Sequence, residues 1–240
     1  MNQKMSSAQL KSIAKGQLLG KYPAVISAEV TVELLVGALS LLCTGLCDQT
    51  SAAGMVITYL VAFILEIMCG IFYVGLSRFY LNLICNRPYT ISDIFHGFRF
   101  HADKAIAVRF FVVTMELIAF IPFFITAFFY YRTQMPAMFL CFCIFGALGG
   151  IAAIIIELHF SQVYYIMLDF PDYSTRQIIR TSKQIMRGNK FRLFYITVSL
   201  LPYYLLAVLS CGIALLWVVP FHKTTLANFY LDLMHREYEV

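Results

Sequence analysis

Long runs of apolar residues alternate with shorter polar and basic segments along this chain of 240 residues. An α-helix rises about 1.5 Å per residue, so about 20 residues cross the roughly 30 Å of hydrocarbon in a bilayer. A transmembrane barrel would instead show strands of about ten alternating residues, a pattern that this chain lacks. We therefore predict an all-α fold, a polytopic transmembrane helical bundle that forms one membrane domain over residues 1–240. The predicted spans are roughly 24–47, 54–76, 106–129, 137–166, 193–209 and 212–231.

The last run is interrupted by Val219-Pro220-Phe221-His222-Lys223, so the number of spans depends on how this segment folds. Ser210-Cys211-Gly212 has the composition of a tight turn, and residues 213–233 would then run back with Pro220 as a kink. This interpretation gives six spans. The alternative is five spans, with the tail on the opposite side.

Composition and charge agree with a membrane protein. Hydrophobic residues make up 60% of the chain, charged residues make up 13%, and the mean hydropathy is +0.77. These values lie far outside the composition of a typical soluble globular domain. Lys and Arg are concentrated before the first span and in the second-to-third and fourth-to-fifth connections, whereas the other loops hold only Arg132. The positive-inside rule then predicts a cytoplasmic N-terminus and, with six spans, a cytoplasmic C-terminus. The net charge of +5 follows from this topology and does not indicate a nucleic-acid partner.

Two segments outside the predicted spans show the helical spacing of amphipathic interfacial helices, residues 1–22 and 174–192, while residues 232–240 are predicted to form a cytoplasmic tail. The second segment begins at a suitable N-cap, Ser174. We expect its cations to contact anionic headgroups, with the lipid bilayer and anionic phospholipids as partners. A plain anchoring role is the alternative. The cations are Arg176, Arg180, Lys183, Arg187 and Lys190.

These two segments also resemble each other at a shift of 168 residues, which places Lys15 on Lys183 and Gly20 on Gly188. Half that shift falls on residues 92–95, the start of a third candidate interfacial helix. The chain is therefore predicted to contain three repeats, each made of one interfacial helix and one membrane hairpin.

Five glutamates fall inside the predicted spans, where a charged side chain costs roughly 2.5 to 3.5 kcal/mol on insertion scales. We expect them to face the bundle interior, together with cations at similar depth. They form either a polar cavity for a proton, cation or amine-bearing solute, or a set of structural ion pairs. Glu33, Glu116 and Glu157 are the leading candidates for a site. The predicted intramembrane polar layer consists of Glu29, Glu33, Glu66, Glu116, Glu157, His159, His222 and Lys223, with Arg78 and Arg109 at the inner ends of their spans.

Sequence patterns of common enzymes do not occur: there is no Walker loop, no G-x-S-x-G and no H-E-x-x-H. The cysteines lack the C-x-x-C spacing of redox or zinc sites, although Cys43, Cys47, Cys141, Cys143 and Cys211 all map near the outer face. We therefore predict no catalytic residues, no metal and no cofactor, and a protein that is not an enzyme.

Several short motifs, taken together, resemble the bacterial integral-membrane family called domain of unknown function 975. That family usually has Tyr where this chain has Phe221. The resemblance implies a bacterial plasma membrane but supplies no functional residue, because the family has no established activity. It covers nearly the whole chain and lies in Gly75-Leu76-Ser77-Arg78-Phe79, Leu81-Asn82, Phe95-His96-Gly97-Phe98, Ser182, Met186-Arg187-Gly188-Asn189-Lys190, Phe194, Gly212-Ile213, Trp217, Pro220-Phe221, Thr225 and Ala227 to Tyr230.

Three classes of function remain open at this stage. The first is a small transporter, permease-like or transport-accessory component that uses the glutamates to handle a small solute or ion. The second is a lipid-engaging or scaffolding protein that acts through its basic helices. A membrane-embedded enzyme is the third. A water-connected cavity lined by glutamates would favour the first, and a dry, salt-bridged interior would favour the second.

Overall fold

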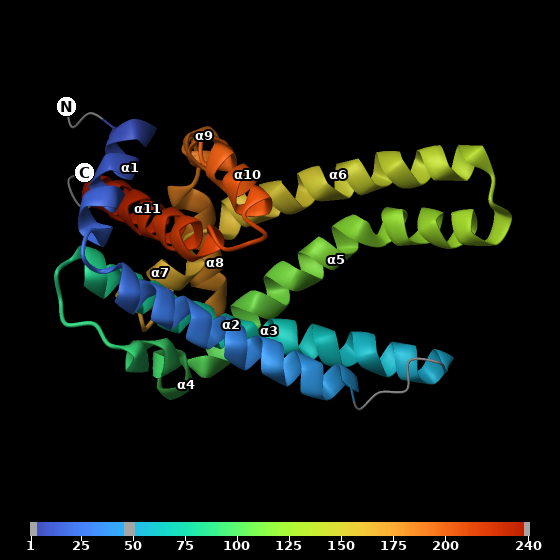
Figure 1. Ribbon diagram of the computed structural model, residues 1–240, viewed down its shortest axis with the longest axis horizontal. Helices are drawn as coiled ribbons and strands as arrows, with labels where there is room; N and C mark the ends of the chain where they lie inside the picture. Colours follow the sequence, from blue (N-terminus) through green and yellow to red (C-terminus); the bar gives the residue numbers. More distant parts are fainter. Residues whose placement is uncertain (1–3, 46–50, 238–240) are drawn as a thin grey trace.

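A computed structural model describes residues 4–45 and 51–237 (Figure 1). Helices make up 84% of the structure, and the described residues contain no strand. The all-α prediction is confirmed. The elements are α1 (Ser7–Leu18), α2 (Tyr22–Gly45), α3 (Ala52–Ile84), the 3-10 helix η1 (Ile91–Phe95), α4 (His96–Arg99), α5 (Ala102–Thr133), α6 (Pro136–Phe160), α7 (Val163–Asp169), α8 (Thr175–Ile185), α9 (Lys190–Val198), α10 (Leu201–Leu209) and α11 (Leu215–Glu237).

Within the described residues, five helical segments are long and apolar enough to cross a membrane, so the protein is a multi-pass membrane protein. The fourth segment combines α6 and α7, which are separated at Ser161–Gln162, and the fifth combines α9 and α10. The break before α10 coincides with Pro202 in its first turn, where proline ends one helix and starts the next. The five segments are 22–45, 53–84, 102–133, 136–169 and 190–209.

The sixth predicted span forms a helix but does not reach the hydropathy of the other five. Cys211 and Gly212 have the positive φ angles of a tight turn, and α11 then runs back as one helix that contains Pro220. Asp232 lies within α11 and is buried, so the predicted tail from residue 232 is helical as far as Glu237. Residues 238–240 lie outside the described part of the chain.

Three capping arrangements at equal intervals support the predicted repeat. Ser6, Thr90 and Ser174 lie 84 residues apart, and each is the N-cap of one helix predicted to be interfacial: α1, η1 (followed directly by α4) and α8, which we call the interfacial helices. Three residues further on, the side chains of Gln9, Asp93 and Gln177 accept a hydrogen bond from the cap's backbone N–H. This reciprocal capping box fixes each helix start. The next positions in register, Leu10, Ile94 and Ile178, are all fully buried.

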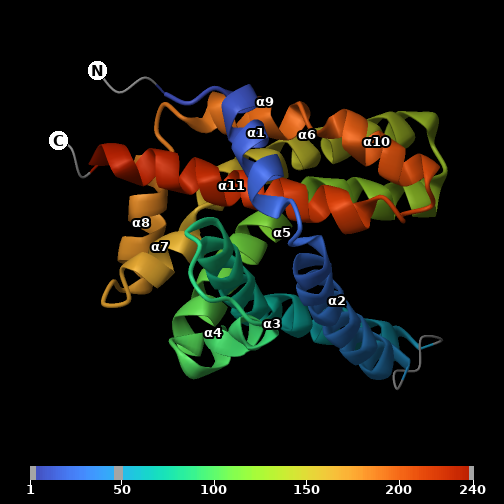
Figure 2. The ribbon, with the colours of Figure 1, turned by 60° about the vertical axis from the view of Figure 1, so that its left-hand side comes forward.

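Each interfacial helix packs on the hairpin of the preceding unit in the chain. Helices η1 and α4 pack on α3, α8 packs on α5 and α6, and α1 packs on α11, the last helix (Figure 2). The α3 contact is close, because a Cβ on Gly75 would lie 1.9 Å from the carbonyl oxygen of Ile94. A Cβ on Gly97 of α4 would in turn lie 2.3 Å from the carbonyl oxygen of Ile71. The three units thus close a ring through their interfacial helices.

The buried core lies at the end of the molecule that holds both termini and the interfacial helices, which we call the basic end (Figure 1). The two long hairpins, α2–α3 and α5–α6, diverge from it and expose large apolar side chains such as Leu41 and Tyr59. Within the α5–α6 hairpin, Gly146 and Gly149 approach the rings of Phe123 and Phe120. Lipid is the natural solvent for these hairpins.

Candidate functional site

A cavity of about 450 Å³ lies where α3, α5, α6, α7 and α11 meet, next to the basic end. Its lining combines apolar walls with ionisable and hydroxyl groups, a composition typical of small-molecule sites. The polar lining residues are Tyr73, Ser77, Tyr80, Arg109, Glu116, Glu157, Ser161, Tyr164, Tyr165 and Lys223. The tyrosines were not predicted, because tyrosine in an apolar span gives no sequence signal that separates a cavity wall from a membrane interface.

One wall of the cavity is fixed by a partly buried ion pair between α2 and α11. Lys223 Nζ on α11 lies 2.7 Å from Glu29 Oε2 on α2, and the side chain of Glu29 is 9% exposed. The Tyr80 hydroxyl donates a hydrogen bond of 2.5 Å to the other carboxylate oxygen. Glu29 thus holds three helices together, and its charge is neutralised by Lys223. The sequence predicted both residues in one layer but did not predict that they pair.

The opposite wall contains a second pair, between Arg109 on α5 and Glu66 on α3. The Arg109 guanidinium also lies over the ring of Tyr73, 5.2 Å from its centroid, which adds a cation–π contact. Its Nε is buried and has no hydrogen-bond partner in the described residues. Arg109 therefore keeps one N–H donor that its protein partners do not use.

Two further carboxylates in the cavity have no such neutralising partner. Glu116 on α5 and Glu157 on α6 both line the cavity, and neither forms a hydrogen bond or an ion pair within the described residues. The two pairs described above are neutral, so the ionised site carries a net charge of −2. Glu116 is half-buried and Glu157 is exposed, and both lie in helical segments long and apolar enough to cross a membrane, where a carboxylate either takes up a proton or recruits a cation. The cavity is therefore suited to a cationic guest.

Other members of the predicted layer lie elsewhere. Glu33 is exposed on α2 and does not line the cavity. His222 Nδ1 lies 2.7 Å from the Tyr204 hydroxyl, and His159 contacts Lys190, so neither histidine pairs with a glutamate. The expected acid–histidine pairs do not form because these imidazoles face other partners.

Arg78, expected to pair with an intramembrane acid, instead contacts the basic end. Its Nε lies 3.3 Å from Asp93 on η1, and its Nη1 lies 2.7 Å from a ring nitrogen of His96 on α4. Burial, followed by the charge of Arg78, lowers the pKa of His96 below its usual value. The neutral imidazole is therefore favoured, and it accepts from the guanidinium. This contact attaches the second interfacial helix to α3.

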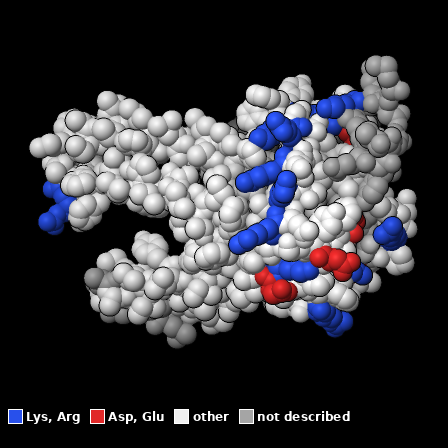
Figure 3. All heavy atoms as spheres, turned by 180° about the vertical axis from the view of Figure 1, so that it is seen from behind, with Lys and Arg blue, Asp and Glu red and all other residues white. Residues whose placement is uncertain are grey.

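The predicted headgroup residues are divided between three elements, because α8 ends at Ile185 rather than continuing to residue 192. Arg176, Arg180 and Lys183 are exposed on α8, and Arg187 is exposed in the turn that follows. Lys190 begins α9 and contacts His159 of α6. Figure 3 shows Lys and Arg gathered around the basic end, with little charge along the hairpins.

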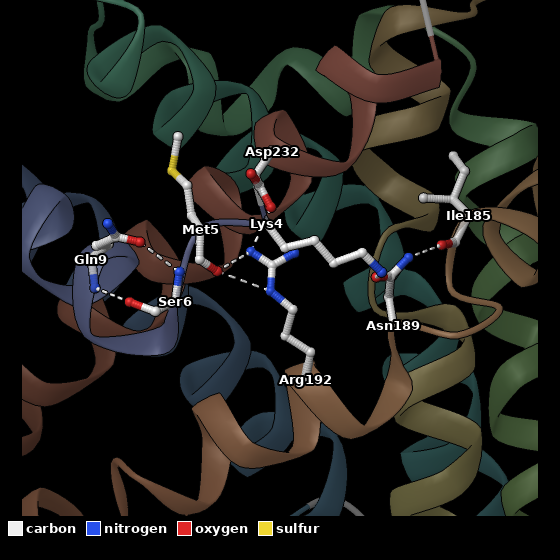
Figure 4. A network of polar contacts seen from close by, with 8 residues as sticks. All are labelled: Lys4, Met5, Ser6, Gln9, Ile185, Asn189, Arg192 and Asp232. Carbon is white, nitrogen blue, oxygen red and sulfur yellow. Dashed lines mark hydrogen bonds and ion pairs between the residues drawn. The ribbon is translucent and has the colours of Figure 1, made fainter. Parts of the chain in front are cut away.

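A network around Arg192 joins the first and last parts of the chain (Figure 4). Arg192 of α9 forms a 2.5 Å ion pair with Asp232 of α11, and its side chain also donates to the carbonyl oxygen of Met5. Lys4 Nζ donates to the Asn189 side chain at 3.0 Å. These residues are up to 228 positions apart, and no local pattern indicated that they meet. The network fixes α1 at the closure of the ring.

The described residues contain no group of three or more His, Cys, Asp and Glu side chains that could hold a metal ion. Of the cysteines predicted near the outer face, Cys43 lies in α2, Cys141 and Cys143 lie in the first turns of α6, Cys211 lies in the turn before α11, and Cys47 falls outside the described residues.

Comparison with known proteins gives one match. A family model described as Protein of unknown function (DUF975) matches residues 1–237. No curated protein and no solved structure matches the chain.

Proposed function

Since the chain belongs to the family described as Protein of unknown function (DUF975), whose description assigns no activity, we propose a function from the cavity itself. We propose a small transporter or permease-like protein that binds a cation or an amine-bearing solute. The observation that carries this proposal is the pair of unpartnered carboxylates, Glu116 and Glu157, in a cavity of about 450 Å³. A lipid-engaging scaffold would not require two acids without ion-pair partners in one cavity.

The cavity can also bind a solute through polar and aromatic contacts. Arg109 and Lys223 are held by their own acids, so they contribute polar surface without repelling a cation as strongly as free cations would. The tyrosine hydroxyls and rings around them suit an ammonium or guanidinium group, which aromatic faces attract. A proton bound by one of the two carboxylates is the simplest ligand.

The proposal places the protein in a bacterial plasma membrane, with the basic end in the cytoplasm. The distribution of Lys and Arg supports this orientation, as do the amphipathic character of α8 and the common position of both termini. Single cysteines on a cysteine-free background provide the test. Positions Ser6 and Thr90 should resist an impermeant thiol reagent added to intact cells, and position Ser51 should react. Labelling of the first two alone would reverse the orientation.

Transport is tested in proteoliposomes with a pH-sensitive dye inside and a panel of three amines outside: methylammonium, putrescine and guanidinium. The wild-type protein should move at least one amine or a proton, and Glu116→Gln or Glu157→Gln should reduce that flux at least tenfold. The control is Glu33→Gln, which removes the same charge from a position on α2 outside the cavity lining and should leave the flux within twofold. Gln variants that lose thermal stability in detergent without any wild-type flux would show a structural role instead.

A further inference from the structure

The outer face of α8 forms a second site that the solute cavity does not involve. A cavity of about 460 Å³ lies between α8 and α5. Arg176, Arg180 and Lys183 line it from α8, while Phe110 and Phe111 line it from α5. We propose that this cavity binds one anionic glycerophospholipid, with its phosphate on the three cations and an acyl chain along Phe110.

The three cations lack acidic partners within the described residues. None of them forms an ion pair or a hydrogen bond there, and no acidic residue lines the cavity. The preceding acids do not compensate them, because Asp169 accepts a hydrogen bond from Tyr230 and Asp172 is exposed outside the cavity lining. Guanidinium groups match phosphate oxygens in geometry as well as charge. A ligand with an anionic phosphate supplies the missing charge.

The other wall of the cavity is apolar and belongs to a spanning helix. Phe110 is 49% exposed on α5, within a segment long enough to cross the membrane. Lys183 lies where the two environments meet, with its Nζ 5.3 Å from the ring centroid of Phe160 and 6.0 Å from that of Phe111. A soluble phosphate would use only the cations. A phospholipid uses both walls, and this is the reason for choosing it as the occupant.

Helix α8 is held in place by hydrogen bonds and by packing against the rest of the protein. Its first turn is held by the Ser174–Gln177 capping box, and Ser182 donates a hydrogen bond of 2.8 Å to the carbonyl oxygen of His159 on α6. Ile178 and Met186 are fully buried beneath it. The cations therefore project from a fixed surface.

The related helix α1 differs from α8 in how two nearby cations are engaged. Lys11 of α1 donates to the Ser199 hydroxyl at 3.0 Å, and Lys4 just before the helix donates to Asn189. Protein groups thus already engage cations near α1, whereas those of α8 face the membrane-exposed side of α5. The repeat supplies similar helices, and in α8 three cations without acidic partners line one cavity beside a spanning helix.

Native mass spectrometry of the full-length protein in detergent tests the proposal, with phosphatidylglycerol and phosphatidylcholine as the probes. The wild-type protein should bind one phosphatidylglycerol in preference to phosphatidylcholine. Each cation near a membrane surface contributes about fivefold in affinity, so R176Q/R180Q/K183Q should weaken phosphatidylglycerol binding at least tenfold. The charge-conserving variant R176K/R180K/K183R should keep binding within about threefold.

The matched control is K15Q/R87Q/R99Q, which removes three exposed cations from the same end of the molecule. It should change phosphatidylglycerol affinity less than threefold. Equal losses in both triple variants would reduce the effect to general charge attraction and overturn the site. Unchanged binding in the α8 variant would overturn it as well.

Two further measurements separate the lipid from its headgroup. Phe110→Ala leaves the charge unchanged and should weaken phosphatidylglycerol binding severalfold. Soluble glycerol 3-phosphate should fail to displace the lipid. Displacement at similar concentrations, or an unaffected Phe110→Ala variant, would show a phosphate site without a lipid chain and would overturn the proposal. These outcomes do not depend on Glu116 or Glu157, so the solute cavity and the lipid site can fail separately.

Discussion

The basic end and the two long hairpins are made of the same helices but are held together differently. At the basic end, elements from all three units interlock, and residues such as Leu10 and Leu83 are fully buried. Toward the tips, Leu41 and Tyr59 are each 75% exposed. Side chains at the basic end therefore pack against other parts of the protein, whereas those toward the hairpin tips depend on lipid to cover them. Mutations should have large effects at the basic end and small effects along the hairpins.

The largest expected effect comes from the Arg192–Asp232 pair. Asp232→Ala leaves the mostly buried guanidinium without its counter-charge, and breaking such a pair costs about 3 to 5 kcal/mol. Thermal unfolding in detergent should show the loss. An Arg192→Met, Asp232→Leu double variant should recover most of the stability, because apolar groups of similar size replace a buried pair at little cost. A double variant as unstable as the single one would contradict this explanation.

Matched leucine truncations compare the two regions directly. Leu10→Ala removes a fully buried side chain from α1 and should cost about 2 to 5 kcal/mol. Leu41→Ala removes the same atoms from an exposed position on α2 and should cost less than about 0.5 kcal/mol. Both values come from the same unfolding assay. Equal losses would mean that the hairpin tips pack against protein, for example in an oligomer.

A glycine pair extends the comparison to the backbone. Gly75→Ala places a methyl group against the carbonyl oxygen of Ile94 and should destabilise the protein by about 1 to 3 kcal/mol. At Gly37 of α2 a Cβ meets no atom within 4 Å, so Gly37→Ala should be neutral or stabilising by up to about 1 kcal/mol. Melting temperatures of the two variants should therefore move in opposite directions.

The smallest expected effect is a pH dependence at His96. Burial lowers the pKa of His96 in the folded protein, with the charge of Arg78 as the next cause, so folding opposes its protonation. Its contribution to stability is present above its unfolded pKa of about 6.5 and decreases as the pH falls below that value. The melting temperature should drop by a few degrees or less between pH 7.5 and 5.5. His96→Gln should reduce that drop, and an identical pH profile would exclude this contribution.

Sequence patterns predicted the helices well because hydropathy and capping are local. The cap at Ser174, the turn at Cys211–Gly212 and the returning final helix all depend on residues a few positions apart. The repeat could be detected for the same reason, since equal spacing is visible without any contact. The span lengths were less accurate, because the breaks within the fourth and fifth segments depend on single residues such as Pro202.

The candidate site was only partly predictable. The energetic cost of a charge in the membrane drew attention to all five glutamates, but it could not separate Glu116 and Glu157, which line the cavity, from Glu33, which does not. The ion pairs could not be predicted from the sequence either, because Lys223 and Glu29 are 194 residues apart in the chain. Partner choice depends on how the hairpins are arranged around one another, and this arrangement is set by the interfacial helices rather than by any span.

The packing of α1 on α11 also determines when α1 can dock during synthesis of the chain. Helix α1 is synthesised before α11, so the apolar face around Leu10 and Leu18 must wait for α11 before it can dock there. The second and third interfacial helices meet their hairpins as soon as they are made. Every nascent chain thus carries α1 without its docking partner until α11 has been synthesised. A truncated chain would keep that helix free, and proteolytic quality control could recognise the unfinished protein by it.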